Sequence, residues 1–265
     1  MYLRVKSKTI YKKACKDLKM LLLVYLISAI FAATCTLTVN RNTCVHDKCE
    51  KIGDTEVCTQ LKTTSSVPIP GTPCPDFEVE VLTPDLKFTK RKLADYKGKY
   101  LIIFFYPADF TFVCPSEIIH FSSMAEQLRK KYNTEIIIGS TDTVYSHHAW
   151  CLQNKTEGGI GPCKCDLFAD TNHKMARDFG ILVEEMGLAL RAMFIVSDKG
   201  IVRHVTINDF PVGRSVEEAM RMIQAFQYAD KTGGVIPCGW TPEKNDFIIP
   251  DPEKKKEYFS KTFTK

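Results

Sequence analysis

The chain has 265 residues, of which 45% are hydrophobic and 25% are charged, a composition that excludes intrinsic disorder and collagen-like or low-complexity classes. The formal net charge is +5, but the first 19 residues hold seven basic residues and one acidic residue. The rest of the chain therefore sums to about −1, and we expect no nucleic-acid partner.

Residues 1–39 are predicted to be a targeting segment, because the basic stretch is followed by an uncharged apolar run. The run from Met20 to Ala33 has 14 residues, the length typical of the apolar region of a signal peptide. Its extension to Val39 gives 20 residues, enough to span a membrane. We expect a protein of the secretory pathway, in the endoplasmic reticulum lumen or secreted. The alternatives are a membrane anchor at residues 20–39 or a mitochondrial presequence.

Residues 40–72 are predicted to be a cysteine-containing extension or linker, because they are polar and end in a segment rich in proline and glycine. The chain has eleven cysteines, and they lack the paired C-x-x-C spacing of a structural zinc site. We therefore expect no metal and no cofactor, and interpret the cysteines as redox-active or disulfide-forming. Cysteines 44, 49, 58 and 74 are candidates for disulfides, with free thiols as the alternative.

The pattern changes to a compact α/β domain from about Pro75 onward. Tyr100 to Tyr106 is a continuous apolar run that predicts a buried strand, Pro115 to Tyr132 has helical periodicity, and Glu135 to Ser140 predicts the next strand. This order is a βαβ unit, so candidate functional residues are expected at the carboxyl end of its first strand.

Later segments predict a hairpin and a second helix. The strands Ala189 to Val196 and Ile201 to Ile207 flank the turn sequence Asp-Lys-Gly, and the helix Val216 to Tyr228 follows a capping Ser215. Strands and helices interleaved in this way predict a single α/β sandwich. The C-terminal tail is predicted to be either solvated or a helix that docks Tyr258 and its neighbour.

Cys114 is the first candidate functional residue, because it lies where the buried strand leads into the helix. Unpaired N–H groups and the positive end of the helix dipole stabilise an anion there, which favours a reactive thiolate. The alternative is an inert buried cysteine. His147 and His148 invite a general-base interpretation, but we expect them at surface positions of a helix.

Several motifs resemble those of a known family. They are P-x-x-x-T-x-x-C at 107–114, DFTFVCPSE at 109–117, GGIG at 158–161, NDFPVGRSVEEAMRMIQAFQY at 208–228, and the pair Tyr258-Phe259. On these motifs the chain, from about Pro75 to its end, resembles the typical two-cysteine peroxiredoxins.

The resemblance implies a fold, an activity and a set of site residues. The fold would be a thioredoxin-like α/β sandwich at residues 73–232, with a central mixed sheet flanked by helices, and the activity would be thiol-dependent reduction of hydrogen peroxide and organic hydroperoxides. Homodimers that assemble into decamers are implied as well. The implied site residues are Cys114 as the peroxidatic nucleophile, Thr111, by its hydroxyl, and Arg191 as the residues that complete the peroxide site, Pro107 as a shield, and Glu117 as the partner of the arginine.

The same resemblance implies a resolving cysteine in the tail, residues 233–265. The matching string is GGVIPCGW at 233–240, so Cys238 lies two positions later than the family pattern. It would bond to Cys114 of the other subunit, and a thioredoxin-like or protein disulfide isomerase-like protein would reduce the disulfide. The alternative function is an oligomeric holdase chaperone or a redox-signalling interaction protein.

Overall fold

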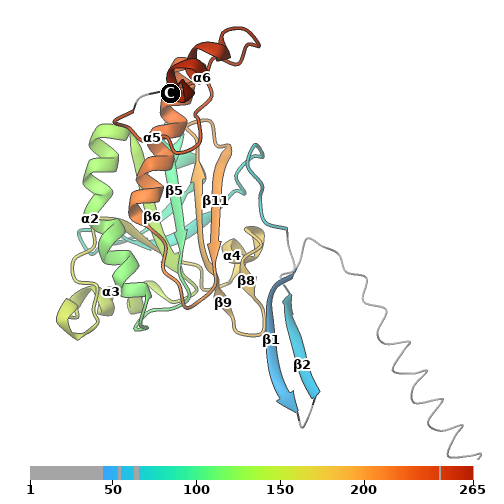
Figure 1. The fold of residues 1–265 in the computed structure, drawn as a ribbon. Coiled ribbons are helices and arrows are strands. Elements are labelled where there is room, and N and C mark those ends of the chain that lie inside the picture. The colour runs from blue at the N-terminus through green and yellow to red at the C-terminus, as the bar shows by residue number, and fades with distance from the viewer. Residues whose placement is uncertain (1–43, 53–54, 63–65, 245, 265) are drawn as a thin grey trace, which may run out of the picture. The chain divides into compact units, whose positions relative to one another are not determined.

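The computed structural model describes residues 44–52, 55–62, 66–244 and 246–264 (Figure 1). The predicted targeting segment, residues 1–39, lies outside them. Within the described ranges, no helix combines the length and the apolar character needed to cross a membrane.

The extension contains regular structure that the sequence analysis did not predict. Strands β1 (Cys44–Ile52) and β2 (Thr55–Lys62) form an antiparallel hairpin, with Cys49 opposite Cys58 in the register. The signal was present in the sequence, because two residues of the type Gly-Asp separate the strands, a spacing typical of a tight hairpin turn.

A seven-stranded mixed sheet forms the centre of the domain, in the order β11-β10-β5-β6-β7-β3-β4. Neighbours among β5, β6 and β7 are parallel, and the remaining pairs are antiparallel. The strands are β3 (Glu78–Leu82), β4 (Phe88–Lys92), β5 (Tyr100–Phe105), β6 (Thr134–Ser140), β7 (Asp166–Ala169), β10 (Arg191–Val196) and β11 (Val202–Asn208). The predicted central strand, βαβ unit and hairpin are all present.

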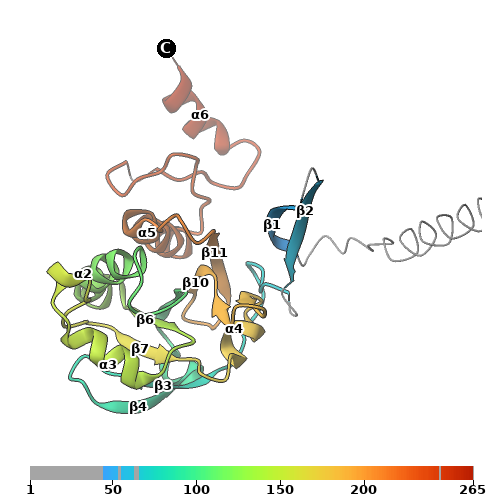
Figure 2. The ribbon, with the colours of Figure 1, turned by 90° about the horizontal axis from the view of Figure 1, so that it is seen from below.

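Strand β5 is buried along its whole length because both faces of the sheet are covered. Ile102 and Phe104 pack in one core cluster with residues of α2, α3 and α5, whereas Leu101, Ile103 and Phe105 pack in a second cluster with residues of α4. Figure 2 shows α2, α3 and α5 on one side of the sheet and α4 on the other. The result is a three-layered sandwich.

The helices of the sandwich are α2 (Cys114–Tyr132), α3 (Val144–Leu152), α4 (Lys174–Asp178) and α5 (Val216–Thr232). Short 3-10 turns occur at Leu93–Tyr96 and Lys155–Glu157, and β8 (Leu182–Val183) pairs with β9 (Leu188–Ala189). Ser215 caps α5 as predicted, because its Oγ accepts the backbone N–H of Glu218 at 3.0 Å.

The C-terminal tail ends in helix α6 (Lys255–Phe263). Between α5 and α6, a bridge joins Val235 to Ile248, and the buried Trp240 stacks on Tyr228 with ring centroids 5.8 Å apart. The tail is thus helical at its end, although the ring of Phe259 remains 46% exposed.

Candidate active site

Cys114 is the first residue of α2, and it is completely buried. The loop 106–113 carries the chain there from the end of β5, and Pro115 in the first helical turn needs no hydrogen-bond partner for its nitrogen. The sulfur therefore lies at the end of a helix where unpaired N–H groups and the dipole stabilise negative charge.

Arg191, the first residue of β10, contacts this sulfur directly. Its Nη1 lies 3.3 Å from Sγ of Cys114 and donates to Oε2 of Glu117 at 2.8 Å. Its Nε donates to the carbonyl oxygen of Phe210 at 2.6 Å. Because the guanidinium is planar, these contacts fix its orientation and direct one N–H edge toward the thiol.

Arg214 also belongs to the site, although the sequence analysis did not single it out. Its backbone N–H and Nε both donate to Oε1 of Glu117, at 2.7 and 2.9 Å, and its Nη2 donates to Oε2 at 3.1 Å. Nη1 donates to the carbonyl of Ala192, and the guanidinium lies 3.4 Å above the ring of Phe104. Burial lowers the pKa of Arg214 below its ordinary value, while Glu117 acts in the opposite direction.

Thr111 and Pro107 lie in the loop that precedes Cys114. Oγ1 of Thr111 donates to the carbonyl of Ala108 at 2.8 Å, and the loop passes through a left-handed conformation at Phe110, with φ of 54°. Because its proton is used in this bond, the hydroxyl oxygen is left as a hydrogen-bond acceptor in this loop. Pro107 is buried beside the end of β5.

A buried network around His147 anchors the same loop. Nδ1 of His147 lies 2.8 Å from Oδ2 of Asp109, and Nε2 lies 2.9 Å from the carbonyl of Phe168. Tyr106 donates to the other oxygen of Asp109 at 2.6 Å, and the N–H of Asp109 donates to Asp142 at 2.8 Å. The loop is therefore held by Asp142, which lies between β6 and α3, and by His147 of α3, as well as by its own backbone.

The predicted surface position of His147 is wrong, because the side chain is completely buried. Helix α3 has only nine residues, too few for its sequence pattern to show which face is buried. The burial of His147 is explained by its hydrogen bond with Asp109, 38 residues away in the sequence. His148 is half-buried and lies beside the ring of Phe88, so only one of the two histidines departs from the prediction.

Cys238 is an exposed free thiol, whereas Cys114 is a buried free thiol. A disulfide requires Cα atoms about 4.4 to 6.8 Å apart, so a bond between them needs Cys114 to move out of its pocket. Cys74 is also a free, buried thiol, which corrects its interpretation as a disulfide cysteine.

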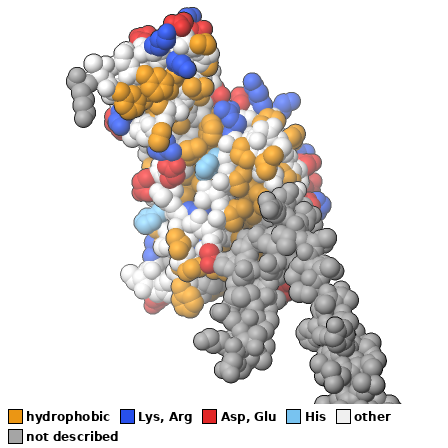
Figure 3. Space-filling model, turned by 45° about the vertical axis from the view of Figure 1, so that its right-hand side comes forward, with side chains coloured by type: hydrophobic (Ala, Val, Ile, Leu, Met, Phe, Trp, Pro, Cys, Tyr) orange, Lys and Arg blue, Asp and Glu red, His pale blue; other side chains and the backbone are white. Residues whose placement is uncertain are grey.

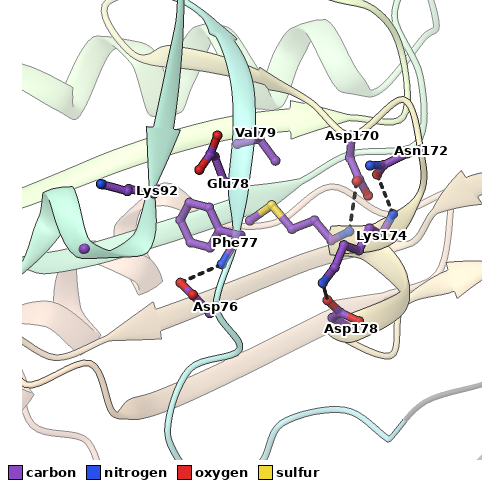
Figure 4. Close-up of a pocket in the computed structure, with 11 residues that line it drawn as sticks. Asp76, Phe77, Glu78, Val79, Lys92, Asp170, Asn172, Lys174 and Asp178 are labelled. Atoms are coloured by element: carbon purple, nitrogen blue, oxygen red, sulfur yellow. Dashed lines mark hydrogen bonds and ion pairs between the residues drawn. The ribbon is translucent and has the colours of Figure 1, made fainter.

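A pocket of about 360 Å³ at β3 and α4 contains none of the predicted site residues (Figure 4). Several of its polar groups are engaged with each other: Asp170 accepts the N–H of Met175, the backbone N–H of Lys174 donates to Asn172, and the Lys174 ammonium pairs with Asp178. The chemistry of the molecule is therefore assigned to the surroundings of Cys114.

The fold and the site together define a class. A thioredoxin-like sandwich that presents a buried thiol to an arginine at the start of a helix is the arrangement of a thiol-dependent peroxidase. Comparisons with known proteins agree, because residues 70–205 match the AhpC/TSA family and residues 225–261 match the C-terminal domain of 1-Cys peroxiredoxin. The chain belongs to the peroxiredoxins and is a thiol-dependent peroxidase.

Its relatives support this assignment over most of the chain. A peroxiredoxin of Cynops pyrrhogaster is 52% identical over 191 residues, which is 72% of this chain and 94% of the relative. Peroxiredoxin-4 of Rattus norvegicus is 50% identical over 175 residues, 66% of this chain and 63% of the relative. These relatives do not favour the alternative of a holdase or interaction protein.

Solved structures share the fold. The reduced 2-Cys peroxiredoxin of Plasmodium vivax superposes with a TM-score of 0.69 at 35% identity, covering 72% of this chain and 98% of that one. The mitochondrial 2-Cys peroxiredoxin of Plasmodium falciparum has a TM-score of 0.61 at 35% identity, covering 64% and 100%.

Proposed function

We propose that Cys114 is the nucleophile of the peroxidase reaction. Its thiolate attacks one oxygen of a hydroperoxide, so that an S–O bond forms while the O–O bond breaks. The leaving oxygen departs as hydroxide or alkoxide and takes up a proton. The products are Cys114 sulfenic acid and one molecule of water or alcohol.

The observation that carries this proposal is the 3.3 Å contact between Arg191 Nη1 and the Cys114 sulfur. The same N–H edge is placed to stabilise the charge that develops on the peroxide oxygens during attack. Thr111 accepts a hydrogen bond from the peroxide, Pro107 shields the sulfur from water, and Glu117 holds the arginine in place.

Ionisation of the thiol contributes less to the acceleration of the reaction than alignment of the peroxide does. An ordinary cysteine is already a few per cent thiolate at neutral pH, so complete ionisation contributes roughly 30-fold, or about 2 kcal/mol. Nucleophilicity also falls as a thiol becomes more acidic. The remaining acceleration is assigned to alignment of the peroxide by Arg191 and Thr111.

Cys238 of a partner subunit is proposed to resolve the sulfenic acid. Its thiol attacks the sulfur of Cys114, the S–O bond breaks, and hydroxide leaves with the thiol proton as water. The exposure of Cys238 supports attack between subunits, within a homodimer that assembles into a decamer. A thioredoxin-like or protein disulfide isomerase-like dithiol then reduces the disulfide.

The proposed location is the secretory pathway, in the endoplasmic reticulum lumen or outside the cell. The basic stretch followed by 14 apolar residues supports it. The alternatives are a membrane anchor at residues 20–39 and a mitochondrial location.

Peptide mapping of the non-reduced full chain, before and after one equivalent of hydrogen peroxide, tests the catalytic cycle. A new link between Cys114 and Cys238, together with a covalent dimer, is expected. The Cys114→Ser variant should lose peroxidase turnover and form no such dimer, whereas Cys238→Ser should reduce peroxide once and then stop. A link from Cys114 to Cys44, Cys49 or Cys58 would instead assign resolution to the N-terminal extension.

A further inference from the structure

Three buried cysteines lie together outside the proposed catalytic cycle. Cys151 lies in the last turn of α3, and Cys163 and Cys165 lie in the segment between Gly161 and β7. Their exposed fractions are 5%, 6% and 1%, and all three pack in the core cluster that faces α2. The interior thus holds three thiols to which the peroxidase mechanism gives no role.

The backbone places Cys163 and Cys165 against each other. In an extended chain two residues at this spacing are about 6.6 Å apart, near the upper limit of about 6.8 Å between the Cα atoms of a disulfide. Here the chain bends at Lys164 and Cys165, so that both thiols point inward while Lys164 is exposed. Both side chains are therefore turned into the same core cluster from positions two residues apart.

Helix α2 fixes this bend from outside the segment. Oγ of Ser122 accepts the backbone N–H of Lys164 at 2.8 Å, which holds the residue between the two cysteines. The geometry of the pair is therefore set by tertiary structure and does not depend on the local sequence alone.

The two thiols differ in their readiness to ionise. The interaction between the two neighbouring side chains lowers the pKa of Cys163 and raises the pKa of Cys165. Burial raises the pKa of Cys151 to about 12, so that thiol stays protonated. The pair therefore contains one nucleophile and one thiol that can condense with it, and Cys151 is a bystander.

We propose that Cys163 and Cys165 form a second peroxide-oxidisable dithiol, which closes to an intrachain disulfide without the participation of Cys114. The sulfur of Cys163 attacks hydrogen peroxide, the O–O bond breaks, and hydroxide leaves and is protonated to water. The thiol of Cys165 then attacks the resulting sulfenic acid, the S–O bond breaks, and a second water leaves. Two thiols are oxidised and one peroxide is reduced.

The small ring predicts how this disulfide behaves. A disulfide across a single intervening residue constrains the geometry, and constrained disulfides are more easily reduced than structural ones. The pair is therefore a reversible redox site, and a dithiol of the class that reduces the catalytic disulfide should reopen it. Each subunit then consumes a second equivalent of peroxide.

Trypsin makes the pairing directly readable. Cleavage after Lys155, Lys164 and Lys174 places Cys163 in the peptide 156–164 and Cys165 in the peptide 165–174, while Cys151 falls in the peptide 132–155. The full chain carrying Cys114→Ser and Cys238→Ser is treated with hydrogen peroxide, its free thiols are alkylated in acid, and the digest is analysed without reduction. We expect peptides 156–164 and 165–174 to appear as one cross-linked species that dithiothreitol separates.

Matched variants distinguish this pair from its neighbours. Adding Cys165→Ser should abolish the cross-linked species, whereas adding Cys151→Ser should leave its yield unchanged. A link between the peptides that carry Cys151 and Cys163, or complete alkylation of all three cysteines after peroxide, would overturn the proposal. The same mapping on the wild-type chain does not depend on whether the variants fold. If the proposed Cys114 cycle fails, only the peptides that carry Cys114 and Cys238 change, so the two proposals are tested separately.

Discussion

At the scale of single residues, the site is organised by one carboxylate between two buried guanidinium groups. Glu117 bonds to both Arg191 and Arg214, and all three side chains are at most 5% exposed. The three charges leave one positive charge in excess, which is costly in a buried environment. A thiolate at Cys114, 3.3 Å from Arg191, neutralises that excess.

Replacing Glu117 with glutamine should therefore destabilise the protein and slow the reaction together. Glutamine keeps the size of the side chain but leaves two buried cations without their counter-ion, and breaking a buried pair costs about 3 to 5 kcal/mol. Urea unfolding measures the loss. Glu126→Gln is the matched control on the same helix, because its pair with Lys130 is exposed and screened by solvent, so its loss should hardly change stability. Equal effects of the two substitutions would refute this role of Glu117.

Arg191 should matter more for alignment than for ionisation. A lysine at this position cannot bond at once to Phe210, Glu117 and the Cys114 sulfur, and loss of one preorganised donor costs about 100- to 1000-fold in rate. We expect Arg191→Lys, which removes a donor to the peroxide, and Thr111→Val, which removes an acceptor, each to slow peroxide reduction by far more than the thiolate fraction of Cys114 falls. Stopped-flow rates, compared with the ultraviolet absorbance of the thiolate, separate the two quantities. Parallel losses in both would contradict the alignment role.

At the scale of elements, the network around His147 joins α3 to the loop that carries Thr111. Burial disfavours the imidazolium, but its hydrogen bond with Asp109 and the charge of that carboxylate outweigh burial and raise the pKa of His147 above 6.5. Because the pKa of His147 is higher in the folded protein, the bond with Asp109 contributes fully to the free energy of unfolding at pH values below 6.5, the ordinary pKa of histidine. It is lost as the pH rises through the folded value.

The free energy of unfolding should therefore decrease as the pH rises above about 6.5, and His147→Gln should flatten that decrease. Glutamine cannot gain or lose a proton in this range, so its contribution does not change with pH. Urea midpoints measured across neutral and mildly alkaline pH test the prediction. His148→Gln, at the half-buried neighbouring position, should keep the wild-type pH dependence. If His147→Gln keeps it as well, the network is not the source.

The elements that sequence patterns predicted are those set by local signals. The apolar run of β5, the periodicity of α2 and the cap of α5 are each encoded within a few neighbouring residues. The surroundings of Cys114 are different, because Arg214 reaches Glu117 across 97 residues. Periodicity cannot report such a contact, which depends on two helix starts meeting at one end of the sheet. The hairpin of β1 and β2 was not predicted, because its strands carry polar residues at many positions and have no continuous apolar run like that of β5.

At the scale of the whole molecule, several large apolar side chains remain exposed next to the site. Phe112 is 96% exposed and Phe110 is 54% exposed in the loop before α2, and Val212 is 59% exposed. Figure 3 shows hydrophobic side chains gathered in patches between the charged ones on one face of the molecule. A buried aromatic side chain removes about 150 to 250 Å² from water, so an exposed one is a strong candidate for contact with another subunit. The proposed homodimer or decamer would cover these residues.

Phe112→Ser should therefore weaken assembly without weakening the fold of the subunit. The ring makes almost no contact within its own chain, so its loss should leave the free energy of unfolding of the subunit within about 0.5 kcal/mol of the wild type. Sedimentation velocity of the reduced full chain should show a shift from larger assemblies toward smaller ones. Phe88→Ser is the matched control, because that ring is 51% exposed but already packs on Tyr145, with ring centroids 5.3 Å apart. Phe88→Ser should lower the stability of the subunit and leave assembly intact. If Phe88→Ser weakens assembly and Phe112→Ser does not, the interface lies at β4 instead.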